Sequence, residues 1–108
     1  MAQNFRRYVN NNVGTATTTV FTANTFDTII GISLANILTT TINASVFITS
    51  GGNDIHLIKD APIVPGSALQ VLDGGAKVVV ESGDIVKVVS DTAASLDTWV
   101  SAVDDIST

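Results

Sequence analysis

Apolar and polar residues alternate with a period of two along almost the whole chain, and this alternation limits the possible folds more than any other feature. The clearest segment is Thr39–Thr49, in which every second residue from Ile42 to Ile48 is apolar. Side chains of an extended strand point alternately to its two faces, so the pattern indicates a strand with one face in the core and one outside. Phe47 is an exception, because its aromatic ring falls on the polar side.

Seven further segments are predicted as strands, because they show the same alternation or are rich in β-branched residues. They are Thr17–Ala23, Asp27–Asn36, Asp54–Lys59, Ser67–Leu72, Ala76–Glu81, Asp84–Ser90 and Ser95–Val103. Glycine, asparagine and proline stand between most of them, as hairpin corners require. No segment has a convincing helical period, and Ala93–Leu96 could form a single turn at most.

Glycine and proline positions refine this pattern. In Asp27–Asn36 we expect Ile30, Ile32 and Leu34 on one face, and Gly31 between them indicates a β-bulge or a close approach of the backbone. Pro62 and Pro65 flank a connection that cannot lie in a central strand. The glycine turns in Leu72–Asp84 could hold a ligand, but we interpret them as hairpin corners, because a phosphate-binding loop would lead into a helix.

The chain of 108 residues has the usual size of one domain. Short strands with turns at regular spacing predict an all-β fold, a single antiparallel β-sandwich of about eight strands that resembles a jelly roll. We expect residues 15–108 to form this sandwich. Residues 1–14 form either an extended N-terminal arm, which ends in a polar spacer at Asn10–Gly14, or an edge strand.

The composition excludes several classes of function. The net charge of −5 argues against nucleic acid, whose phosphates require clustered Lys and Arg. No apolar run approaches the roughly 20 residues of a membrane span and no secretory signal is visible, so we expect a soluble protein without a membrane partner. Charged residues make up 14% of the chain, which suggests that other proteins cover part of its surface, although Thr and Asn could solvate it instead.

The sequence offers little for catalysis or metal binding. His56 is the only histidine and there is no cysteine, so the ligands of a zinc site are missing, although His56 lies two residues from Asp54. Asp54, Asp60, Asp73 and Asp84 match ordinary turns rather than a calcium loop, and Asp104–Asp105 matches a solvated end. No nucleophile motif accompanies the Ser, His and Asp residues. We therefore expect no enzymatic activity, no metal and no cofactor.

Two groups of residues are candidates for contact with a partner. Trp99 is the only tryptophan, and it faces outward as an interface anchor if Leu96, Val100 and Ala102 face the core. If its strand is buried on both sides, Trp99 belongs to the core instead. The second group is an aromatic and cationic stretch near the N-terminus, and Phe47 is added because of its place on a polar face. The candidate interface residues are Phe5, Arg6, Arg7, Tyr8, Phe47 and Trp99.

Four motifs carry a resemblance to a known group of proteins. They are APIVPGS at Ala61–Ser67, LDGG at Leu72–Gly75, VESGD at Val80–Asp84 and AASLD at Ala93–Asp97. With TTVFTANTFDTIIGISLANI further upstream, the chain resembles small virion structural proteins of tailed bacteriophages from about Phe5 to Val103. It looks most like those of T4-like phages that infect marine cyanobacteria.

This resemblance implies a β-sandwich that is part of a virus particle assembled in the host cytoplasm. The resemblance does not name the part of the particle. Together with the low charge density and the β-sandwich pattern, it leads us to expect an accessory component that binds other virion proteins, with decoration or cementing of the capsid as the first expectation. A neck, tail or fibre protein is the alternative. A carbohydrate-binding module for receptor recognition is a further alternative, which rests on the jelly-roll pattern and on Trp99 with Asp97 and Ser101 rather than on the resemblance. The resemblance carries no catalytic residues. We also expect the chain to form a homo-oligomer, since β-rich subunits commonly associate by closed symmetry.

Overall fold

The computed structural model describes residues 4–23, 27–72 and 78–104, and these residues form strands and turns without a helix. The strands are β1 (Asn4–Val13), β2 (Thr18–Thr22), β3 (Asp27–Asn36), β4 (Ile42–Ser50), β5 (Asn53–Ile63), β6 (Ala68–Leu72), β7 (Val78–Val80), β8 (Ile85–Ser90) and β9 (Leu96–Asp104). The predicted all-β fold is therefore confirmed.

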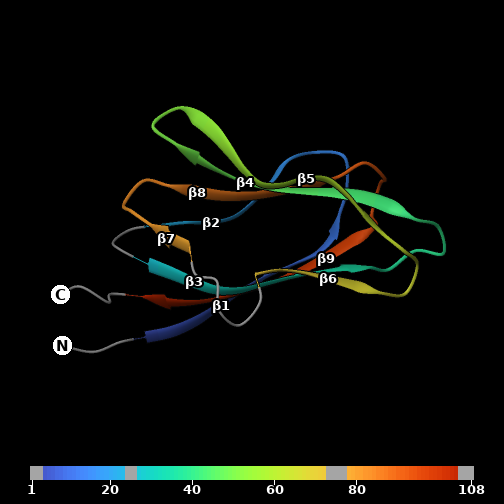
Figure 1. Cartoon of the computed structure of the whole chain (residues 1–108), viewed down its shortest axis with the longest axis horizontal. Coiled ribbons are helices and arrows are strands. Elements are labelled where there is room, and N and C mark those ends of the chain that lie inside the picture. The colour runs from blue at the N-terminus through green and yellow to red at the C-terminus, as the bar shows by residue number, and fades with distance from the viewer. Residues whose placement is uncertain (1–3, 24–26, 73–77, 105–108) are drawn as a thin grey trace.

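The strands form two antiparallel sheets that lie one above the other (Figure 1). Sheet A has the order β1-β9-β3-β6, with β7 also paired to β3, and sheet B has the order β2-β8-β4-β5. The pairs β1–β9, β2–β8, β3–β6 and β4–β5 are nested along the chain, as in a long hairpin wound into two layers. This winding is the jelly-roll order that the sequence predicts.

The core lies between the two sheets and takes its side chains from one face of each. Sheet A contributes Ile29, Leu34 and Leu96, and sheet B contributes Ile42 and Val86, all of them fully buried. Each such side chain stabilises the fold by about 1.5–3 kcal/mol relative to exposure. At the margin where β1 and β2 meet, the rings of Tyr8 and Phe21 stack with centroids 4.1 Å apart and close the core.

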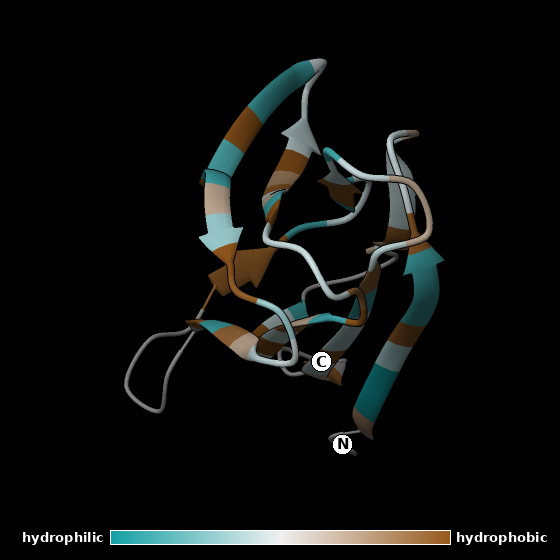
Figure 2. Cartoon of the chain, turned by 90° about the vertical axis from the view of Figure 1, so that its right-hand side faces the viewer, coloured by the Kyte–Doolittle hydropathy of each residue, from teal (hydrophilic) through white to brown (hydrophobic). Residues whose placement is uncertain are grey.

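The N-terminal residues form an edge strand rather than an arm. Asn4–Asn10 pairs with β9 without interruption, and Figure 2 shows β1 along one margin of the molecule. The predicted spacer is not free either, because Asn10–Val13 continues β1 through a bulge. Asn12 adopts a left-handed backbone with φ 54°, and its N–H donates to the Asp97 carboxylate at 3.0 Å. This hydrogen bond fixes the end of the strand.

Strand β5 continues through the proline that we expected in a connection. Pro62 pairs with Asn43 inside Asn53–Ile63, which is possible because β5 is the outer strand of sheet B. Asp60 forms a bulge with φ 52°, and its N–H donates to Ser45 Oγ at 2.9 Å. The prediction that this proline avoids a central strand is right, but the predicted end of the strand at Lys59 is wrong.

The glycine turn at Ser82–Gly83 is a corner, as predicted. Gly83 has φ 94°, which glycine adopts without strain, and the Asp84 carboxylate accepts from the Glu81 N–H at 3.0 Å. The turn connects β7 to β8 and therefore leads into a strand rather than a helix. The other predicted corner, Asp73–Gly75, lies outside the described residues.

Thr98 places an unpaired hydroxyl group in the core, since its Oγ1 is buried and has no hydrogen-bond partner among the described residues. Replacing Thr98 by Val removes this desolvated group at nearly constant volume. We expect Thr98→Val to raise the free energy of unfolding by about 1 kcal/mol in a denaturant titration. The reverse change at the neighbouring inward position, Val100→Thr, serves as the control. It should lower the free energy of unfolding by about 1–3 kcal/mol, because it buries a new hydroxyl group.

Asp91 connects the turn after β8 to the start of β4. Its carboxylate accepts from the Asn43 N–H at 3.0 Å, from the Thr92 hydroxyl at 2.9 Å and from Asn43 Nδ2 at 3.2 Å. The Asn43 N–H is the largest of these influences, and together they hold the pKa of Asp91 below its ordinary value of 3.8. The carboxylate therefore stabilises the folded chain when it is ionised.

A lowered pKa in the folded state contributes stability above the unfolded pKa, and this stability is lost as the pH falls through the folded pKa. We expect Asp91→Asn to unfold more easily than the wild type at neutral pH. The difference should be small because Asp91 is exposed, and it should vanish at acidic pH. Thermal unfolding of both proteins between neutral and strongly acidic pH measures it, and a pH-independent difference would contradict this interpretation.

Candidate partner-binding face

Trp99 lies on the outer face of sheet A. Its neighbours Thr98 and Val100 are buried in the core, so alternation along β9 directs the indole outward, and 51% of Trp99 is exposed. Of the two orientations that the sequence left open, the structure has the outward one. The physical reason is that sheet A has one covered face only, so every second residue of its central strand remains uncovered.

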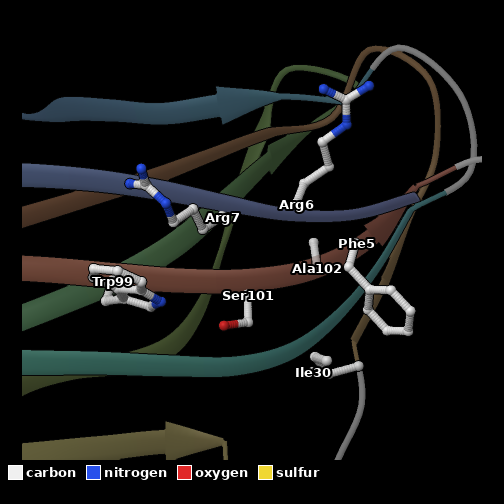
Figure 3. Close-up of a pocket in the computed structure, with 7 residues that line it drawn as sticks. All are labelled: Phe5, Arg6, Arg7, Ile30, Trp99, Ser101 and Ala102. Carbon is white, nitrogen blue, oxygen red and sulfur yellow. The ribbon is translucent and has the colours of Figure 1, made fainter.

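Two of the four N-terminal candidates join Trp99 on this face. Phe5 is 76% exposed, and the Arg7 guanidinium carbon lies 5.4 Å from the centre of the Trp99 ring, a cation–π distance (Figure 3). Tyr8 instead faces the core side, where it stacks on Phe21. Arg6 points away from Arg7 and Trp99 in the close-up, since consecutive strand residues face opposite sides.

A shallow hollow of about 450 Å³ lies beside these side chains. It is lined by Phe5, Arg6, Arg7, Ile30, Trp99, Ser101 and Ala102. Ile30 reaches it because β3 has a bulge between Ile29 and Gly31, which confirms the bulge predicted from Gly31. The bulge shifts the alternation, so Ile29 takes the buried position and Ile30 is exposed. The expectation that Ile30 shares the face of Ile32 is therefore wrong.

Gly31 on β3 pairs with Ser101 on β9, one of the residues that line the hollow. A side chain at this position would meet no atom within 4 Å, so the second interpretation of Gly31, a close approach of another backbone, does not apply. Further along β3, Ser33 and its neighbour Gln70 on β6 form a polar pair. In that pair Gln70 Nε2 donates to Ser33 Oγ at 3.1 Å.

We define the outer face of sheet A by its exposed or partly exposed aromatic, aliphatic and polar side chains. They are Phe5, Arg7, Val9, Ile30, Ser33, Gln70, Val79, Trp99 and Ser101. The single cation among them, Arg7, lies against the indole, and the nearby Asp97 carboxylate accepts from the Asn12 N–H. This combination of rings, aliphatic groups and neutral hydrogen-bonding groups is suited to the burial of a partner's surface.

Phe47 lies apart from this face, on the outside of sheet B. It is 7% exposed, because His56 on the paired strand covers it with ring centroids 4.9 Å apart. Asp54, on the same side as His56, accepts a hydrogen bond from the Thr49 hydroxyl at 2.7 Å. Phe47 therefore offers little surface to a partner, and the ring that made it a candidate is covered by a neighbour that sequence spacing does not reveal.

Within the described ranges no group of three or more His, Cys, Asp or Glu side chains could hold a metal ion. The same ranges contain no helix with the length and apolar character needed to cross a membrane. No protein-family model matches the sequence, and a search of curated proteins gives no match. Any functional assignment therefore depends on the residues of this protein and on their geometry.

Gly31, which pairs with Ser101 at the hollow, can carry a side chain without disturbing the fold. Gly31 has open space at its Cβ position and a backbone that does not require glycine. We expect Gly31→Ala to raise the free energy of unfolding by about 0.5–1 kcal/mol, because alanine loses less conformational entropy in a strand. Denaturant titration measures this, and the emission of Trp99 reports whether the face is unchanged. A loss of stability would show that the space at the Cβ position of Gly31 is not open as described.

Proposed function

We propose that this protein is a structural component of a bacteriophage virion that acts by binding other virion proteins. The observation that carries the proposal is the outer face of sheet A, on which Phe5, Trp99 and Arg7 stand exposed on a rigid sandwich with few charges. Exposed aromatic and arginine side chains are typical of protein interfaces. The resemblance to small virion proteins supplies the particle in which such an interface would be used.

The exposure of these rings has an energetic consequence. An aromatic side chain buries about 150–250 Å² when it is covered, so Phe5 and Trp99 offer a large part of the apolar area of a binding centre. Such residues dominate binding energy when they lie at the middle of an interface. Arg7 stays charged beside the indole and would bind a carboxylate or carbonyl group of the partner.

The sandwich positions these groups without a conformational change. β1, β9 and β3 are hydrogen-bonded side by side, so Phe5, Trp99 and Ile30 are displayed at fixed spacing on one sheet. A preorganised face loses little entropy on binding, which suits a component that attaches to many equivalent positions. We assign it first to decoration or cementing of the capsid, and a place on the neck, tail or a fibre is the alternative.

Binding to particles that lack the chain tests this proposal. Purified protein should bind to heads assembled without it, and Trp99→Ala should weaken binding by roughly 30-fold, the effect of a residue worth about 2 kcal/mol. Ile55→Ala is the matched control, because Ile55 is 57% exposed on β5 of the other sheet. Binding to tails alone would favour the alternative location, and absence of binding to heads and tails would reject the proposal.

A second candidate function is binding of a carbohydrate. It is favoured by the exposed indole of Trp99 beside the hydroxyl group of Ser101 and the Ser33–Gln70 pair, in a jelly roll, a fold that lectins also use. A glycan array distinguishes the two. Specific saccharide binding that is lost in Trp99→Ala would support this candidate, and an array without signal for the wild type would remove it.

A further inference from the structure

The four margins of the two sheets differ in how well they are protected against a further strand. Outer strands expose a template for pairing, and proteins usually shorten, bend or interrupt them. β2 and β6 have five residues each, and β7, which lies on the same margin of sheet A as β6, has three. β5 is long, but it contains Pro62 and the bulge at Asp60. Over Asn4–Asn10, β1 is neither short nor interrupted, its register with β9 is continuous, and Arg6 and Arg7 are its only charged residues.

We propose that β1 pairs antiparallel with β1 of a second copy of this chain, about a two-fold axis perpendicular to sheet A. This pairing joins the two A sheets into one. A two-fold contact places the same strand on both sides, so it requires a strand that is complementary to itself. The inference does not depend on the virion assignment, since it rests on backbone pairing at the margin of sheet A, although Arg7 and Val9 of the outer face lie along that margin.

Geometry restricts the possible registers. Directly opposite residues of an antiparallel pair place their side chains on the same face of the sheet. The two-fold axis keeps the outer face of one copy on the same side as the outer face of the other. Outward residues such as Phe5, Arg7 and Val9 must therefore lie opposite outward residues. This is possible only if one residue of β1 lies directly opposite the same residue of the second copy, and we call that residue the position of the axis.

Charge and chain geometry then select one of these registers. An axis at Arg6 or Arg7 would place an arginine opposite its own copy, and like charges directly opposite are unfavourable. An axis at Val9 would bring the bulge at Asn11–Asn12 into the ladder. An axis at Phe5 would leave few of the described residues to pair.

An axis at Tyr8 keeps the two arginines apart and moves the bulge at Asn11–Asn12 to the ends of the ladder, outside the pairs formed by residues 6–10. It places Arg7 opposite Val9 of the second copy, and Arg6 opposite Asn10. Each Arg7 then lies between its own Trp99 and an apolar neighbour, which is compatible with the cation–π contact that it already makes. An interface made by one strand margin is smaller than the standard 1,600 Å² or so, and we expect a dimer with a dissociation constant of about 1–100 µM.

Substitutions of Val9 test this register with opposite signs. Val9→Glu places a carboxylate opposite Arg7 twice in each dimer, and Val9→Lys places an ammonium group there instead. Sedimentation equilibrium over a concentration series should show dimerisation about three- to tenfold tighter for Val9→Glu and at least tenfold weaker for Val9→Lys. Because both variants lose the same side chain, a general defect in folding cannot produce opposite shifts.

Val79 provides the matched control. It is also an exposed valine on the outer face of sheet A, 62% exposed against 46% for Val9, but it lies on β7 away from β1. Val79→Glu and Val79→Lys should leave the dimerisation constant within about twofold of the wild type. A wild-type chain that stays monomeric at about 1 mM, one that forms another oligomer, or Val9 variants that shift together or not at all would overturn the proposal.

Discussion

Each sheet of this protein can bury only one of its faces, and the rest of the structure depends on this constraint. Two sheets enclose a single core, with Leu34 and Leu96 on one side and Ile42 and Val86 on the other. The alternation of side chains that fills this core also places every second residue outside. Trp99, Phe5 and Arg7 are displayed because Thr98, Tyr8 and Val100 beside them face inward.

The jelly-roll winding decides which residues meet on the outer face. β1 and β9 come from opposite ends of the described chain and pair directly, which brings Arg7 over Trp99. β3 lies on the other side of β9, and its bulge turns Ile30 toward the same region. The candidate face therefore combines three strands that are distant in sequence. Its rigidity follows from the ladder hydrogen bonds that hold these strands together.

Part of this site was accessible from the sequence. Gly31 signalled the bulge, and the spacing of Leu96, Val100 and Ala102 gave Trp99 a conditional outward orientation. Ile30 was assigned to the wrong face because a bulge adds one residue and shifts the alternation after it. The sequence predicts Phe47 and Tyr8 as residues that contact a partner, but the ring of His56 covers Phe47 and the ring of Phe21 stacks on Tyr8. Such covering neighbours lie on other strands, so local pattern does not identify them.

The sequence by itself determined the all-β class, the approximate position of the strands and the corners between them. These follow from local properties: a period of two, β-branched residues, and glycine or proline where the backbone turns. Only the tertiary structure decided that β1 is an edge strand, that β5 tolerates Pro62, and that Trp99 joins Phe5 and Arg7. These outcomes depend on which strands are neighbours and which margins remain unpaired. Strand order is set by the packing of the whole chain, so it cannot be derived from the pattern of any single segment.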